Sequence, residues 1–100
     1  MVEFLFWEEC PSHEEALALL REVLAESGRD PKAVEIVEVR TDEDAQRLGF
    51  PGSPTIRVDG RDIDADGAGR PGLLCRIYHL PDGRPSPVPS RDQLEEALRT

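Results

Sequence analysis

The sequence predicts a single α/β domain in which helices flank a central mixed β-sheet. Short β-branched or aromatic segments alternate along the chain with segments whose apolar residues recur every three or four positions. Gly and Pro residues separate these segments, which places the elements in the order β-α-β-α-β-β-α. A chain of 100 residues has room for one small hydrophobic core, so residues 1–100 are expected to form one domain.

The first two elements are a buried strand and an amphipathic helix. Nearly every residue of Val2–Trp7 is apolar or aromatic, as in a strand covered on both faces. The helix is indicated by one apolar stripe, formed by Ala16, Leu17, Leu19, Leu20, Val23 and Leu24. Pro11 suits its first turn and Gly28 suits its C-terminal cap. Cys10 is therefore predicted to lie at or beside the helix N-cap.

The middle of the chain again alternates predicted strands with a predicted helix. The β-branched residues of Val34–Val39 predict a second strand. Thr41 and Asp44 have the spacing of a capping box, which predicts a short acidic helix that ends at Gly49. After a turn rich in Pro and Gly, Thr55–Val58 predicts a third strand.

The last third of the chain begins with a hairpin signal at Asp59-Gly60. The segment Asp62–Gly72 is rich in Gly and Asp and is expected to be an exposed loop. Leu73–His79 predicts the fourth strand. Ser90 is expected to cap the final helix, with Gln93 at the reciprocal position of a capping box.

The charge of the chain excludes two classes of partner. Lys and Arg number 12 against 21 Asp and Glu, which gives a net charge of −9. Nucleic acids and anionic membrane surfaces are held mainly by Lys and Arg, so we expect neither as a partner. The apolar stretch Phe4–Trp7 is too short for a membrane span or a signal sequence. We therefore expect a cytoplasmic protein, in which two cysteines are either one redox couple or two unrelated thiols.

Two segments carry the candidate chemistry. Cys10 and Pro11 stand at the predicted start of a helix, where unpaired N–H groups and the helix dipole stabilise a thiolate, the nucleophilic form of cysteine. The second segment, Gly52–Gly60, contains Ser53-Pro54-Thr55 at the entrance to a predicted strand.

These segments, in this order of elements, resemble the thioredoxin-like family over residues 1–60. Phe6–His13 resembles the segment that presents the reactive cysteine after the first strand, and Gly52–Gly60 resembles the loop that carries the family's cis-proline. The resemblance implies a thioredoxin fold and thiol–disulfide exchange at Cys10. It also implies that Pro54 is cis and lies against Cys10.

The resemblance further implies protein or small-molecule thiols and disulfides as partners, without a cofactor. The substrate-binding residues that it implies are Pro11, His13, Ser53, Pro54 and Thr55. The backbone groups of the proline loop would be free to pair with an extended substrate. Arg70 and Arg76 could meet an acidic partner such as glutathione, although scattered, solvated arginines are the simpler interpretation.

The chain departs from the family at His13, where a two-cysteine motif would have its second cysteine. In one interpretation Cys75 is the resolving thiol, brought to Cys10 by the flexible loop 66–72. A disulfide would need the two Cα atoms within roughly 7 Å of each other. The alternative is that Cys75 is an inert, small apolar residue in a strand.

Two further interpretations dispense with a second thiol. In one, Cys10 acts as a monothiol and His13 either helps to hold the thiolate or is only solvated. Glu8 and Glu9 oppose the helix end, because nearby negative charge raises the pKa of a thiol. In the other, the chain keeps the fold without the chemistry and serves as a binding module. The sequence favours a thiol–disulfide oxidoreductase and leaves enzymatic activity open.

Metal binding is not predicted. Cys10 and His13 could in principle combine with Cys75 and His79, but strand spacing separates the second pair and disfavours a closed zinc site. A thiophilic ion such as copper(I) or mercury(II) needs fewer ligands and is an alternative. The segment Asp62–Gly67 matches the start of a calcium loop but lacks the bidentate glutamate at its end.

Overall fold

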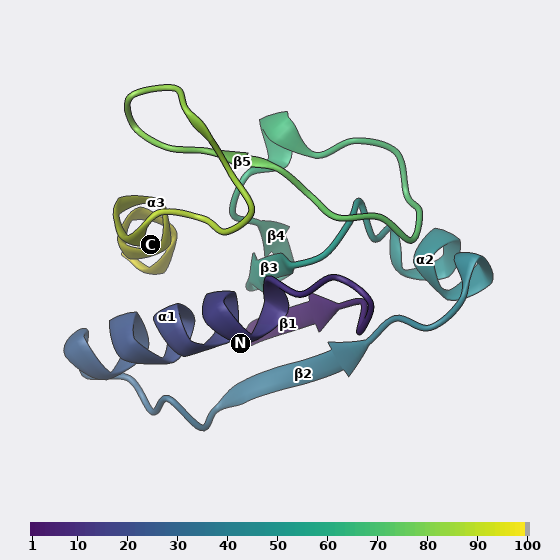
Figure 1. Ribbon diagram of the computed structural model, residues 1–100. Helices are drawn as coiled ribbons and strands as arrows, with labels where there is room; N and C mark the ends of the chain where they lie inside the picture. Colours follow the sequence, from purple (N-terminus) through teal and green to yellow (C-terminus); the bar gives the residue numbers. More distant parts are fainter. Residues whose placement is uncertain (100) are drawn as a thin grey trace.

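Strand β1 (Val2–Phe6) lies in the middle of the main sheet. It pairs in parallel with β2 (Val34–Glu38) and antiparallel with β3 (Thr55–Val58). Strand β4 (Arg61–Asp62) then pairs antiparallel with β3, which gives the sheet order β2-β1-β3-β4. The structure is a computed structural model that describes residues 1–99, and within them this mixed four-stranded sheet and three helices form an α/β protein (Figure 1). A radius of gyration of 12.5 Å makes it compact.

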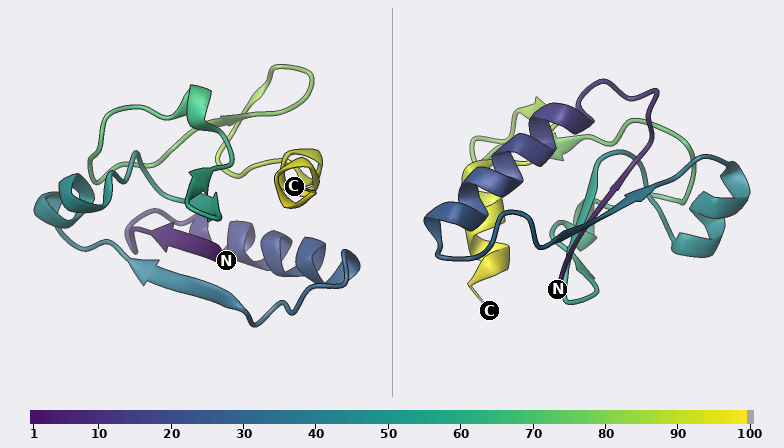
Figure 2. Two further views of the ribbon diagram at one scale, coloured as in Figure 1. Left: turned by 180° about the vertical axis from the view of Figure 1, so that it is seen from behind. Right: turned by 90° about the horizontal axis from the view of Figure 1, so that it is seen from below.

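Two helices cover one face of the sheet and the third covers the other. Helices α1 (His13–Glu26) and α3 (Arg91–Leu98) lie side by side, whereas α2 (Asp42–Leu48) lies apart from them (Figure 2). The core is divided accordingly into two clusters. The first packs α1 and α3 on the sheet through Val2, Phe4, Ala16, Leu20, Val23, Leu24, Val34, Ile56, Val58, Leu94 and Leu98. The second packs α2 on the other face through Leu5, Val39, Ala45 and Phe50.

The caps of α2 and α3 form as local rules predict. The Asp44 N–H donates to Thr41 Oγ1 at 3.0 Å, and α2 ends at Gly49 in the left-handed conformation with φ of 63°. The Gln93 N–H donates to Ser90 Oγ at 3.1 Å. The reciprocal bond expected from the Gln93 side chain is absent, because its buried Oε1 has no hydrogen-bond partner among residues 1–99.

The start of α1 differs slightly from the prediction. Ser12 is the N-cap, so Pro11 precedes the helix instead of lying in its first turn. The Ser12 side chain makes no capping hydrogen bond, and its Oγ lies 3.3 Å from Cys10 Sγ. The expectation that Cys10 lies beside the N-cap is confirmed.

The predicted fourth strand, Leu73–His79, is wrong in its extent. Only β5 (Tyr78–His79) is a strand, and it pairs with β6 (Pro85–Ser86) in a separate two-stranded sheet. The fourth place in the main sheet belongs to β4. Asp59 and Gly60, with φ of 52° and 81°, turn the chain back at once, so the residues directly after the turn take the free edge of β3.

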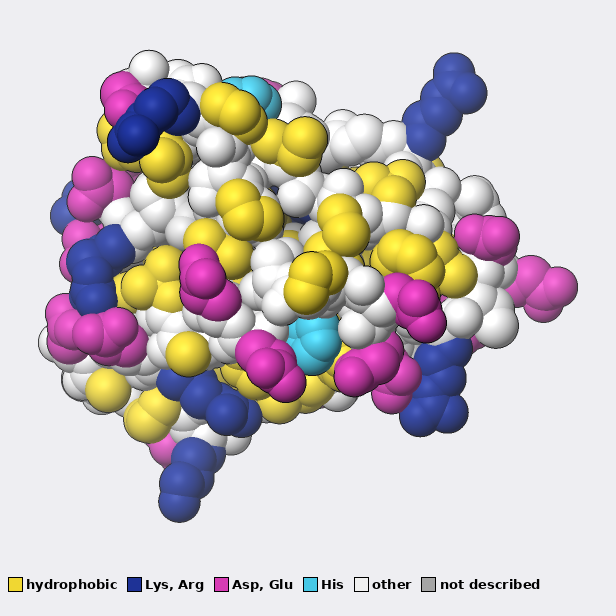
Figure 3. All heavy atoms as spheres, viewed as in Figure 1, with side chains coloured by type: hydrophobic (Ala, Val, Ile, Leu, Met, Phe, Trp, Pro, Cys, Tyr) yellow, Lys and Arg dark blue, Asp and Glu magenta, His cyan; other side chains and the backbone are white. Residues whose placement is uncertain are grey.

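Charged side chains are dispersed over the surface. Figure 3 shows Asp and Glu side chains spread around a central zone where hydrophobic side chains gather, on the face seen in Figure 1. Among residues 1–99, no helix combines the length and the apolar character that crossing a membrane would require.

Candidate functional site

Cys10 is buried between the start of α1 and the loop that precedes β3. Its residue is only 1% exposed, and its backbone N–H donates to the Trp7 carbonyl oxygen at 3.0 Å. The thiol donates to the Ser53 carbonyl oxygen at 3.5 Å and also contacts the Ser12 hydroxyl. Cys10, in the first of the two segments with candidate chemistry, therefore contacts the second segment at Ser53.

The loop before β3 has the expected conformation. The Ser53–Pro54 peptide bond is cis, and Ser53, Pro54 and Thr55 are all buried. The Trp7 N–H donates to Ser53 Oγ at 3.0 Å, which ties the end of β1 to this loop. Thr55 Oγ1 donates to the Gly52 carbonyl oxygen at 2.6 Å. These bonds hold the loop against the cysteine segment.

The backbone of Ser53 is not free to pair with a substrate, contrary to the sequence-based expectation. Its N–H donates to the Leu74 carbonyl oxygen, and its carbonyl oxygen accepts from the Arg76 N–H, both at 2.8 Å. This pair of bonds is a parallel bridge between Ser53 and Cys75. The chain's own segment 74–76 thus occupies the backbone groups that were expected to receive an extended substrate.

Gly52 permits this close approach. It has φ of 130°, which L side chains rarely adopt. A Cβ atom at this position would lie 2.8 Å from Leu74 Cδ1 and 3.1 Å from Arg76 Cβ. A larger residue would therefore push segment 74–76 away from the loop.

Arg76 anchors segment 74–76 to the main sheet. Its residue is 3% exposed, and its guanidinium donates two bonds of 2.8 Å to the two carboxylate oxygens of Asp62. It also donates to Thr55 Oγ1 at 3.2 Å and to the Asp64 carbonyl oxygen at 2.8 Å. Burial lowers the pKa of Arg76, but the hydrogen bond to Asp62 and the surrounding negative charge raise it overall. The expectation that Arg76 is solvated is wrong, because this buried fork joins it to β4.

Tyr78 completes the anchor. The Arg76 guanidinium lies over the Tyr78 ring, 4.7 Å from its centroid, in cation–π geometry. The Tyr78 hydroxyl donates to the Pro54 carbonyl oxygen at 2.6 Å. Burial raises the pKa of Tyr78, so the phenol stays protonated and keeps this bond at ordinary pH. Sequence analysis did not assign a role to Tyr78.

The two cysteines meet at this site. Cys75 forms a backbone bridge with Ser53, whose carbonyl oxygen accepts from the Cys10 thiol, and both cysteines are free thiols. Burial raises the pKa of Cys10, but interactions with the side chains of Cys75, Ser12 and Ser53 and with the Ser12 backbone outweigh it and lower the pKa overall. Interaction with Cys10, together with burial, raises the pKa of Cys75 to about 11. These opposite shifts favour ionisation of Cys10 before Cys75.

His13 and Pro11 are not part of this network. The His13 ring stacks on Phe6 with 4.7 Å between centroids, and its Nε2 lies 3.7 Å from Glu8 Oε2. Within residues 1–99 its contacts are thus with a neighbouring ring and a carboxylate, and the groups that lower the pKa of Cys10 are the hydroxyls, the backbone and Cys75. Pro11 is exposed beside Cys10 in the chain.

The structure brings together no set of metal ligands. Among residues 1–99, no group of three or more His, Cys, Asp or Glu side chains is arranged to hold a metal ion. In the segment that matched the start of a calcium loop, Asp62 is bound by Arg76 and the Asp64 carboxylate accepts from the Gly67 N–H at 3.2 Å. These internal bonds use the oxygens that a cation would need.

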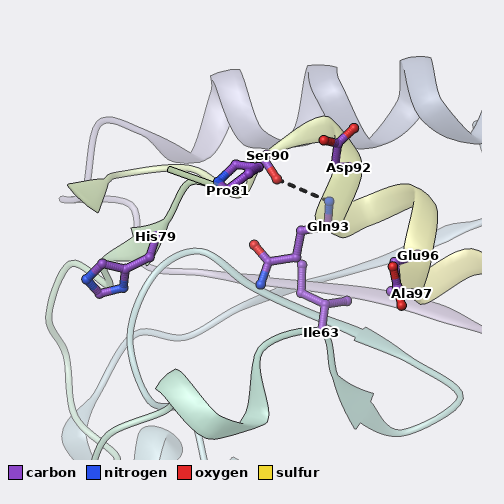
Figure 4. Close-up of a pocket in the computed structure, with 8 residues that line it drawn as sticks. All are labelled: Ile63, His79, Pro81, Ser90, Asp92, Gln93, Glu96 and Ala97. Atoms are coloured by element: carbon purple, nitrogen blue, oxygen red, sulfur yellow. Dashed lines mark hydrogen bonds between the residues drawn. The ribbon is translucent and has the colours of Figure 1, made fainter. Parts of the chain in front are cut away.

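Two surface hollows lie near this end of the fold, and one of them adjoins Cys75. That groove has a volume of about 500 Å³ and also contains Pro51, Arg70, Leu74 and Ile77. The other, of about 370 Å³, lies between α3 and the segments around Ile63 and Pro81 and contains no thiol (Figure 4).

Comparison of the chain with models of known protein families, with curated proteins and with solved structures finds no match. The functional argument therefore depends on the geometry of the site.

Replacing Gly52 by Ala should separate the two thiols, because the new Cβ would collide with Leu74 and Arg76. We expect the yield of the Cys10–Cys75 disulfide, measured by non-reducing mass spectrometry after mild oxidation, to fall severalfold. Gly69→Ala is the matched control, since Gly69 has no heavy atom within 4 Å of an added Cβ. Equal disulfide yields in both variants would contradict this role of Gly52.

Proposed function

We propose that this chain is a thiol–disulfide exchange protein with a thioredoxin fold, in which Cys10 and Cys75 form the redox pair. The observation that carries the proposal is that both cysteines lie against Ser53: the Cys10 thiol donates to the Ser53 carbonyl oxygen at 3.5 Å, and Cys75 forms a backbone bridge with Ser53. Cys75 supplies the second thiol that position 13 lacks. Exchange partners are protein or small-molecule thiols and disulfides, and the proposed setting is the cytoplasm.

The arrangement of the elements supports the fold assignment. Strands β1 and β2 are parallel, β3 is antiparallel to β1, β4 is antiparallel to β3, and α1 and α3 share one face. A helix starts directly after the reactive cysteine, as the resemblance requires. Residues 63–90, between β4 and α3, are an addition to this arrangement of elements and contain Cys75.

The electrostatics of the pair support redox chemistry. A stabilised Cys10 thiolate is a good leaving group when an outside thiol opens the Cys10–Cys75 disulfide. Opening the disulfide takes two electrons from two outside thiols, which become a disulfide, while Cys10 and Cys75 become thiols. A low-molecular-weight disulfide reverses the reaction and restores the protein disulfide.

The first test is formation of the internal disulfide. Treatment of the reduced protein with glutathione disulfide should give a monomer that has lost two hydrogen atoms and carries no glutathione. Peptide mapping should locate the bond between Cys10 and Cys75, because both cysteines lie against Ser53. Wild-type protein that accumulates only glutathione adducts, as Cys10→Ser and Cys75→Ser must, would exclude the redox pair.

The second test is the pH dependence of the thiols, followed by the ultraviolet absorbance of the thiolate. In the wild type, the pKa of Cys10 should be lower than that of an ordinary thiol, and Cys75 should titrate near 11. Cys75→Ala removes a donor to the Cys10 sulfur, so the pKa of Cys10 should rise and its thiolate fraction at neutral pH should fall. An unchanged or lower pKa of Cys10 in Cys75→Ala would show that Cys75 does not stabilise the thiolate.

A further inference from the structure

The two thiols differ sharply in access. Cys10 is 1% exposed, whereas Cys75 is exposed and stands between the exposed side chains of Leu74 (42%) and Ile77 (57%). Segment 74–76 already uses the backbone N–H and carbonyl of Ser53. A molecule that approaches the loop from outside therefore meets Cys75 before Cys10.

The surroundings of Cys75 have a charge unlike that of the whole chain. The groove of about 500 Å³ beside it is lined by apolar residues, glycines, a histidine and the two arginines Arg70 and Arg76. No Asp or Glu is among these residues, although the net charge of the chain is −9. The Arg76 guanidinium is bound to Asp62, whereas Arg70 is exposed and has no ion-pair partner within residues 1–99. Arg70 is thus available to an anion in the groove.

We propose that Cys75 is the sulfur that exchanges with outside thiols and disulfides, and that its groove favours those that carry carboxylates. Cys10 is then the internal partner, which touches the outside substrate only through Cys75. This inference rests on the proposed redox pair and assigns the order in which its two sulfurs react. It reverses the roles expected from sequence, in which Cys10 attacks the substrate and Cys75 resolves.

The chemistry proceeds in two balanced steps. In oxidation of the reduced protein, the Cys10 thiolate accepts the proton of Cys75, and the Cys75 thiolate attacks an outside disulfide. A Cys75–substrate disulfide forms and one outside thiolate leaves. Cys10 then gives that proton to the outside thiolate released in the first step and attacks the Cys75 sulfur, which forms the internal disulfide and releases the second outside thiolate. Two electrons pass from the protein to the outside disulfide, and the reverse sequence reduces the protein.

Variants with a single cysteine distinguish two effects on the reaction rate of a thiol, namely its accessibility to the outside disulfide and the fraction of it that is ionised. In Cys75→Ser the serine hydroxyl can still donate to Cys10, so the remaining thiol keeps a low pKa but stays buried. In Cys10→Ser the remaining thiol is exposed and loses the neighbour that raises its pKa. The probe is glutathione disulfide, and the readout is the rate of glutathione addition, followed by mass spectrometry.

We expect Cys10→Ser to react about tenfold faster than Cys75→Ser, because access limits the reaction of the buried thiol. In denaturing urea both thiols are accessible, so the two rates of glutathione addition should differ only by the small effect of the neighbouring residues in the sequence. Faster addition to Cys75→Ser in the folded state, or equal rates, would overturn the inference while leaving the redox pair intact. If wild type forms no internal disulfide, the redox pair itself fails, whichever variant reacts faster.

The charge preference has its own test in the Cys10→Ser background. Arg70→Gln should slow addition of glutathione disulfide by roughly two- to fivefold, as expected for one partly screened charge. Addition of cystamine, a disulfide with cationic ends, should not slow. Arg21→Gln changes the net charge equally, but Arg21 does not line the groove, so it should leave the ratio of the two rates unchanged. An unchanged ratio in Arg70→Gln would overturn the preference for carboxylates.

Discussion

The site depends on the attachment of segment 74–76 to the loop that precedes β3. Two backbone bonds join Ser53 to Leu74 and Arg76, and the buried fork between Arg76 and Asp62 fixes the segment to β4. Breaking such a buried pair by removing one partner usually costs about 3–5 kcal/mol. Without this attachment Cys75 would belong to an exposed loop, and Cys10 would be a single thiol at a helix end.

The attachment also explains why the two thiols differ in exposure and in pKa. Segment 74–76 pairs with Ser53, against which Cys10 is buried, and burial raises the pKa of the Cys10 thiol. The same segment supplies Cys75, whose interaction with Cys10, together with those of Ser12 and Ser53, reverses that effect. The pair therefore combines a stabilised, protected sulfur with an exposed sulfur of high pKa, so a substrate meets the less ionised thiol first.

Local sequence rules predicted the elements that depend on local contacts. Thr41 and Ser90 cap their helices as expected, and Cys10 lies beside the start of α1. The fourth strand failed because the Asp59-Gly60 turn and the edge of β3 decide which residues pair, and a β-branched segment alone does not. The burial of Arg76 could not be foreseen, since it requires Asp62, Thr55 and Tyr78 to converge from three segments.

The most direct measurement of the central claim is an equilibrium titration in glutathione redox buffers, with free thiols counted by alkylation and mass spectrometry. If Cys10 and Cys75 are one redox pair, both thiols should disappear together in a single two-electron transition without bound glutathione. Independent loss of the two thiols, each with its own glutathione adduct, would contradict the account.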